Sequence, residues 1–153
     1  MQKLFYTIDC SKRKIEDFIS LLHSRQVNLL IDVRPNPMEN SISSYNCNVL
    51  EQYLINEKIS YKFMGRELGY LTKMKESRMT INYLNSISYL EAGLEFNYRI
   101  ALMSADSDIQ ITIIEADLRK RGYEVMKLLS DENLKKNELE VSSFFISGDR
   151  NIS

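Results

Sequence analysis

A nearly continuous apolar run at residues 29–33 (LLIDV) limits the fold more than any other feature of this chain. Only Asp32 interrupts the run, which is typical of a strand that is buried on both faces of a sheet. Pro35 and Pro37 follow the run closely, and they are the two prolines of the chain. Strands of this kind occur in parallel sheets that helices cover on both sides, so the run favours an α/β fold.

The period of the apolar residues predicts the other elements. Short apolar runs predict strands at residues 4–8, 59–63, 98–103 and 124–129, with a last strand at 141–146. Helical spacing predicts helices at residues 12–25, 49–54, 83–94 and 109–121. Ser11 is expected to cap the first helix, Gly122 to end the last, and the polar residues 36–48 to form a long loop. Strands that alternate with helices predict a three-layer α/β/α fold with a mostly parallel sheet of about five strands.

Length and composition indicate one globular domain. We expect a single domain over residues 1–153, with a core at about 4–129 and a C-terminal extension at 130–153. Hydrophobic residues make up 44% and charged residues 27%, which argues against a disordered chain. No apolar run is long enough to span a membrane, and the N-terminus lacks the apolar segment of a signal peptide. We therefore expect a cytoplasmic protein with no membrane association.

Charge and residue usage argue against several classes of site. The 20 Lys and Arg residues balance 21 Asp and Glu residues, so a broad nucleic-acid-binding surface is not expected. Cys10 and Cys47 stand outside any CxxC motif, and His23 is the only histidine, so neither a disulfide framework nor a zinc site is predicted. The sequence predicts no metal and no cofactor, and it favours a reducing compartment.

Asp32 and Arg34 are the first candidates for a ligand site. In a parallel sheet covered on both faces, ligands bind beyond the carboxyl ends of the strands. Both residues stand at such an end, and strand alternation puts their side chains on the same face. Arg34 could hold a phosphate or carboxylate through two parallel hydrogen bonds. The alternative is structural: Asp32 caps the following segment and Arg34 pairs with it.

Ser11, Glu67 and Ser104 complete the candidate ligand-binding residues. Backbone amides at the turn of Ser11 could receive an anion, although a capping role alone accounts for this residue. Glu67 stands in the predicted loop 65–69, so its carboxylate either reaches the shared crevice or forms a solvated pair with Arg66. Ser104 directly follows another predicted strand, but no histidine is placed to activate it as a nucleophile.

Cys10 is the weak candidate for a nucleophile. A thiol at the start of a helix and beside the basic residues 12–14 is favoured as the reactive thiolate, whereas the alternative is a small residue that fills a tight turn. Asp32 and Glu67 are weak candidates for acid–base chemistry, provided that the fold brings their carboxylates together.

Several blocks at these strand ends resemble the DUF488 domain family of bacteria and archaea. The family opens with a strand close to YTIGHS, and residues 6–11 read YTIDCS. Its LVDVR block with nearby prolines is similar to residues 30–37, LIDVRPNP. Its I-x-Y, ELGG and LMCAE blocks are similar to residues 59–61, 67–70 and 102–106. The resemblance covers residues 4–129 and implies an α/β fold with a site at the strand ends.

The chain departs from the family where the polar groups of chemistry are expected. Cys10 stands in place of the family's histidine, Ser104 in place of its cysteine, and the CHR motif has no counterpart. We therefore expect a divergent member that binds a small anionic ligand, nucleotide-like or phosphate-like, through Asp32 and Arg34, with its chemistry reduced or lost. Two alternatives stay open: an active enzyme that uses Cys10, or Asp32 with Glu67, and a protein-interaction module without a ligand.

Overall fold

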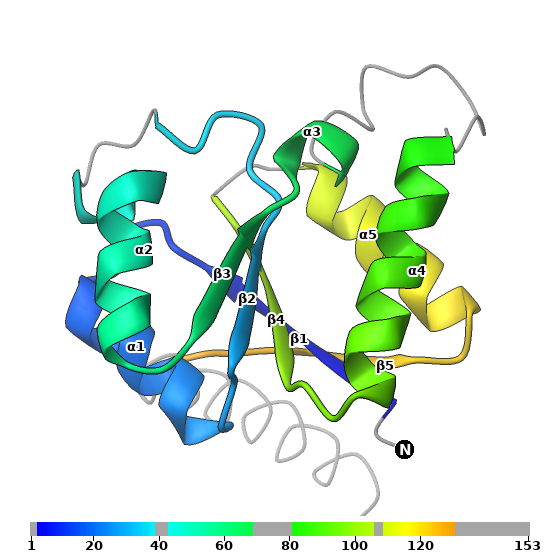
Figure 1. Cartoon of the computed structure of the whole chain (residues 1–153), viewed down its shortest axis with the longest axis horizontal. Helices are drawn as coiled ribbons and strands as arrows, with labels where there is room; N and C mark the ends of the chain where they lie inside the picture. Colours follow the sequence, from blue (N-terminus) through cyan, green and yellow to red (C-terminus); the bar gives the residue numbers. More distant parts are fainter. Residues whose placement is uncertain (1–2, 39–42, 69–80, 106–108, 131–153) are drawn as a thin grey trace, which may run out of the picture.

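The computed structural model of the chain describes residues 3–38, 43–68, 81–105 and 109–130. Five parallel strands form one sheet in the order β3-β2-β4-β1-β5 (Figure 1). The strands are β1 Leu4–Asp9, β2 Leu29–Asp32, β3 Ser60–Phe63, β4 Ile100–Ser104 and β5 Glu124–Lys127. The predicted fold class, an α/β fold with a parallel sheet, is confirmed. The predicted strand at 141–146 lies outside the described residues, as does nearly all of the predicted C-terminal extension.

The described helices lie between the strands along the chain. They are α1 Ile15–Ser24, η1 Ser43–Tyr45, α2 Cys47–Asn56, α3 Gly65–Leu68, α4 Ile81–Glu95 and α5 Ile109–Lys120, of which η1 is a single 3₁₀ turn. None of the helices in the described part of the chain is both long enough and apolar enough to cross a membrane.

Two apolar cores lie on opposite faces of the sheet. One core joins Leu30 of β2 to side chains of α1 and α2, such as Phe18 and Leu54. The other joins Ile31, the next residue of β2, to side chains of α4 and α5, such as Leu90. Side chains of consecutive strand residues point to opposite faces, so each strand contributes to both cores. Figure 1 shows the resulting three layers, with α1 and α2 on one side of the sheet and α4 and α5 on the other.

At the carboxyl end of β4, the connections that leave neighbouring strands go to opposite faces of the sheet. This strand lies between β1 and β2 in the sheet. The chain leaves β1 and β2 for α1 and α2 on one face, and it leaves β4 for α5 on the other face. A crevice forms where neighbouring strands send their connections to opposite faces, and such crevices are the usual ligand sites of parallel sheets. This edge of the sheet carries Cys10, Arg34 and Ser104.

The first helix begins later than predicted. Its N-cap is Lys14, which makes no side-chain capping bond. Ser11 instead lies in a turn, where its backbone N–H donates to the Oδ1 atom of Asp9 at 2.8 Å. Lys12 then adopts the left-handed region with φ of 56°, and a right-handed helix cannot run through that conformation. The capping role predicted for Ser11 is therefore wrong.

Two predicted loops contain helical turns. The polar segment 36–48 contains η1 and the first residues of α2, and the segment after β3 forms α3. A Cβ atom at Gly65 would overlap with the carbonyl oxygen of Arg34, so glycine allows α3 to begin close against the end of β2. Gly122 ends α5 with φ of 95°, as the sequence predicted.

Candidate functional site

Asp32 and Arg34 form a buried pair at the carboxyl end of β2. The Arg34 Nε donates to Oδ1 of Asp32 at 3.0 Å, and Nη2 donates to Oδ2 at 2.8 Å. The backbone N–H of Arg34 also donates to Oδ1, at 3.1 Å. Asp32 is 0% exposed and Arg34 is 2% exposed. The prediction that their side chains share a face is confirmed, and the two parallel bonds give the geometry that guanidinium and carboxylate groups prefer.

Tyr61 supplies another donor to the same carboxylate. It lies on β3 beside Leu30 of β2, and its hydroxyl donates to Oδ2 of Asp32 at 2.6 Å. Burial raises the pKa of Tyr61, and the charge of Asp32 and this hydrogen bond raise it further. Tyr61 therefore stays a neutral donor at physiological pH, and the carboxylate of Asp32 has one partner just beyond β2 and another on β3.

Tyr45 connects Arg34 to the turn between β1 and α1. The Arg34 Nη2 donates to the carbonyl oxygen of Tyr45 at 2.7 Å, and the Tyr45 hydroxyl donates to the carbonyl oxygen of Arg13 at 2.7 Å. The ring of Tyr45 is fully buried and packs edge-on against Phe18 of α1, with ring centroids 5.2 Å apart. One side chain thus fixes η1 between the end of β2 and the start of α1.

The remaining terminal nitrogen of Arg34, Nη1, is buried and has no hydrogen-bond partner among the described residues. Burial by itself lowers the pKa of Arg34, but the hydrogen bonds and charge of Asp32, with smaller effects of Cys10 and Tyr61, raise it above its usual value. Arg34 is therefore always charged, and two N–H groups at Nη1 lack an acceptor. A buried donor without an acceptor costs free energy, so it marks a place where an acceptor from outside the chain is favoured.

Cys10 lies in the core beneath α1 and α2, next to this cluster. Its side chain is 0% exposed and shares the face of the sheet on which Tyr6, Ile8 and Leu30 pack. Its charge as a thiolate would affect the pKa values of both Arg34 and Tyr45, which places the thiol near both groups. Its backbone N–H donates to the carbonyl oxygen of Ser104 at 3.0 Å.

The other predicted site residues are not gathered around Arg34. Ser104 is buried at the end of β4, but alternation along β4 directs its side chain toward the core under α4 and α5. Glu67 lies in α3, which packs on α4 and not on the face that carries Asp32. Ser11 is half-buried in the turn after β1. The hydrogen bonds described for the Asp32 carboxylate come from Arg34 and Tyr61, and none involves Glu67.

Comparison of the chain with protein-family models, with curated proteins and with solved structures gives no match. The site therefore has to be interpreted from its own geometry. Within the described ranges, no group of three or more His, Cys, Asp or Glu side chains is placed to hold a metal ion. The chemistry that the geometry offers is charge pairing and hydrogen-bond donation around a buried guanidinium.

Tyr45 and Tyr61 are the site residues that the sequence interpretation missed. Tyr61 stands in the I-x-Y block at residues 59–61, and its place in that block within a predicted strand is the signal that could have drawn attention to it. Tyr45 stands in a polar segment that was expected to be a loop, and nothing in its surroundings distinguishes it as a core residue. Its role depends on contacts with Arg34, which is 11 positions away along the chain, and with Arg13, which is 32 positions away. Local sequence pattern does not encode such contacts.

Proposed function

We propose that the protein binds a small anion, of phosphate size, between Arg34 and the turn that leads from β1 into α1. The observation that carries this proposal is the buried Nη1 atom of Arg34, for which the described part of the chain supplies no hydrogen-bond partner. A phosphate or carboxylate oxygen is the acceptor that a guanidinium group prefers, and a charge-assisted bond of this kind is about twice as strong as a neutral one.

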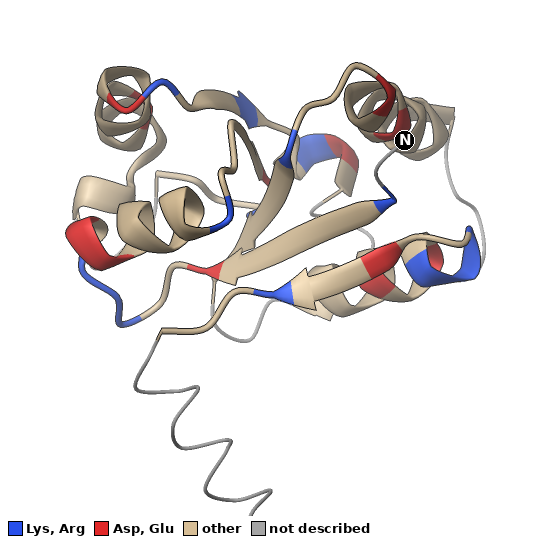
Figure 2. Ribbon diagram, turned by 90° about the horizontal axis from the view of Figure 1, so that it is seen from below, with Lys and Arg blue, Asp and Glu red and all other residues tan. Residues whose placement is uncertain are grey.

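The start of α1 supplies a second group of donors. Lys14 caps the helix without a side-chain hydrogen bond, so no cap side chain occupies the amides of the first turn. Such amides, together with the helix dipole, favour a negative charge. Lys12, Arg13 and Lys14 make the preceding turn basic, which Figure 2 shows as a blue segment ahead of α1. Tyr45 links Arg34 to this turn through its contact with Arg13.

Two features limit the size and affinity of the ligand. Arg34 is only 2% exposed, so the anion has to enter a nearly closed site, which favours a phosphate group over a polymer. Asp32 neutralises much of the charge of Arg34, and Glu16 and Asp17 are exposed in the first turn of α1. The expected affinity is therefore modest and falls with increasing salt concentration. A nucleotide or sugar phosphate would bind through its phosphate, with the rest of the molecule outside the cluster.

The test is a thermal-shift screen with phosphate, sulfate, sugar phosphates and nucleotides. A ligand at about one hundred times its Kd stabilises the folded state by ~2.7 kcal/mol. For a chain of this size, that stabilisation raises Tm by about 5–10 °C. Arg34→Lys keeps a positive charge for Asp32 but removes Nη1, and we expect it to abolish the shift. Arg119→Lys, at an exposed arginine of α5, is the matched control and retains the shift.

Two results would contradict the proposal. If no anion in the screen raises Tm, or if wild type and Arg34→Lys respond equally, Arg34 has only the structural role of pairing with Asp32. Chloride at equal ionic strength distinguishes a specific anion from general screening.

A second candidate function is catalysis by Cys10. It is favoured by the closeness of the thiol to Arg34, because a guanidinium stabilises a thiolate. The side chain is fully buried, so a substrate reaches it only if the cover formed by α1 and Tyr45 opens. Cys10→Ser separates the two functions: it would abolish any turnover that depends on the thiol and leave anion binding at Arg34 in place.

A further inference from the structure

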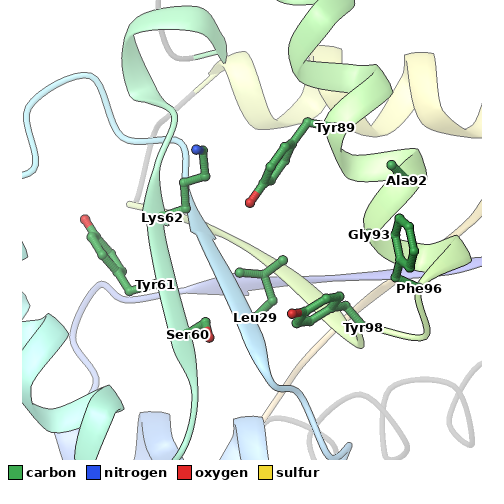
Figure 3. A pocket seen from close by; sticks show the side chains of 9 residues that line it. All are labelled: Leu29, Ser60, Tyr61, Lys62, Tyr89, Ala92, Gly93, Phe96 and Tyr98. Atoms are coloured by element: carbon green, nitrogen blue, oxygen red, sulfur yellow. The ribbon is translucent and has the colours of Figure 1, made fainter.

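A hollow lies on the other face of the sheet, away from Arg34. It has a volume of about 480 Å³ and is bounded by the edge strand β3, the start of β2 and the C-terminal half of α4. Its floor and sides include Leu29, Ser60, Ala92 and Gly93. Tyr61 also borders it, but the ring of Tyr61 points away from the hollow in Figure 3. The volume falls within the range of sites for small organic ligands.

Three aromatic rings surround this hollow and remain exposed. Tyr89 is 43% exposed, Phe96 is 79% exposed and Tyr98 is 42% exposed. Single exposed apolar residues are common, but a group of rings around one concave surface marks a binding site. Figure 3 shows Tyr89 above Leu29 and Tyr98 and Phe96 to the right of it, so a ligand in the hollow lies against rings from α4 and the residues that follow it.

Lys62 adds a positive charge at the rim. Its Nζ atom lies 4.7 Å from the centroid of the Tyr89 ring, and the side chain projects from the exposed edge strand. Alternation along β3 puts Lys62 on the face opposite Tyr61 and therefore on the side of the hollow. Among the described residues, the ion pairs found involve other cations, so the ammonium of Lys62 faces a ring and no carboxylate. A cation in that position is complementary to an anionic group on a ligand.

We propose that this hollow binds a small planar aromatic compound that carries one anionic group. The flat ring packs against Tyr89, Tyr98 and Phe96, because aromatic faces stack on one another with little dependence on the identity of the ring. The anionic group pairs with Lys62 at the rim. The small side chain of Ala92 leaves room for the ring against α4, whereas the space beside the Cα atom of Gly93 is filled by the side chain of Ile100. Two sources of this chemistry, a nucleotide and an aromatic carboxylate, are separated by the choice of probes.

The experiment is an NMR titration of the ¹⁵N-labelled full chain with adenosine 5′-monophosphate and, separately, with indole-3-acetate. Adenosine and inorganic phosphate serve as the ring-only and charge-only probes. We expect saturable shifts of the amides of Lys62, Ala92 and Gly93 with the aromatic anions, because these residues line the hollow. Shifts with the nucleotide alone identify a nucleotide site, and similar shifts with both probes identify a site for aromatic anions in general.

Two variants with matched controls test the assigned contacts. Lys62→Gln is expected to weaken binding of the aromatic anions about tenfold while leaving that of adenosine unchanged. Tyr98→Ala is expected to weaken all the aromatic probes about tenfold. Lys120→Gln, at the end of α5, and Tyr53→Ala, on α2 and equally exposed at 42%, are the controls and retain full binding.

Several results would overturn the proposal. They are the absence of shifts at these amides with both aromatic anions at millimolar concentration, equal shifts with phosphate alone, or equal weakening by the control variants. The titration distinguishes this site from the anion site at Arg34. Binding at Arg34 is expected to shift amides in the turn between β1 and α1, whereas binding in the hollow shifts those of Lys62, Ala92 and Gly93. Either site can therefore fail without affecting the conclusion about the other.

Discussion

Replacing Asp32 by asparagine nearly preserves the shape of the buried cluster but removes the charge that Arg34 faces. Asp32 is 0% exposed, and its carboxylate accepts hydrogen bonds from Arg34 and Tyr61. Breaking a buried ion pair by removing one partner costs ~3–5 kcal/mol, because the other charge remains buried without compensation. Stabilities of single domains are about 5–15 kcal/mol, so the Asp32→Asn protein folds but with much of its stability lost.

A double-mutant cycle measures how much of this loss belongs to the pair. Arg34→Met removes the guanidinium and leaves Asp32 buried with Tyr61 as its one side-chain donor among the described residues, so we expect a loss of ~3–5 kcal/mol. The double variant Asp32→Asn/Arg34→Met buries no charge at this site, and it should lose less than the sum of the single variants by at least ~2 kcal/mol.

Urea unfolding followed by circular dichroism is the assay, with the free energy of unfolding taken from the midpoint and slope. Additive losses, or single losses below about 1 kcal/mol, would show that Asp32 and Arg34 act as independent surface-like charges. The reasoning from their burial and geometry would then be refuted.

Three further predictions concern packing, accessibility and pH. Gly65→Ala should destabilise by ~1–3 kcal/mol in urea unfolding because the added methyl group meets the carbonyl oxygen of Arg34, and an unchanged midpoint would contradict that close approach. In native protein, a thiol reagent should modify Cys47, which is partly exposed, well before the buried Cys10, and equal rates would contradict the burial of Cys10. The contribution of the tyrosine hydroxyls to stability should be constant below pH 10 and fall above it, because phenols in the unfolded chain ionise near pH 10 whereas four folded phenols hold their protons longer. Phenolate absorbance during a pH titration of the folded protein should show a group of tyrosines that ionises late. The group consists of Tyr45, Tyr61 and Tyr83, whose pKa values burial raises, and Tyr123, whose pKa is raised to about 12. Ionisation of these four tyrosines near pH 10 in the folded protein would contradict the prediction.

The sequence predicted the part of the fold that depends on local pattern. The apolar run at residues 29–33 became β2, with all four strand residues buried, because a strand inside a parallel sheet must be apolar on both faces. Alternation also predicted that Asp32 and Arg34 share a face, which is a property of the strand itself.

Features that depend on distant contacts could not be predicted in this way. The start of α1 shifted to Ile15 because Lys12 adopts a left-handed conformation, and a lysine gives no local signal for that. Ser104 ends a strand near Arg34, but its side chain lies on the face of the sheet opposite to the one that α1 and α2 cover. Which face those helices cover depends on the order of the strands, which local pattern does not predict. Tyr45 reaches the core because Arg34 and Arg13 bind it from two other segments.

Arginine side-chain NMR tests the central claim, that the buried Nη1 of Arg34 receives an anion, most directly. In protein labelled with ¹⁵N-arginine, the guanidinium resonances of Arg34 are identified by their loss in Arg34→Lys. Phosphate titration should shift these resonances saturably and slow the exchange of their protons with water, because a bound oxygen occupies the two free N–H groups. Resonances of Arg34 that stay unchanged while phosphate reaches high millimolar concentration would contradict the claim.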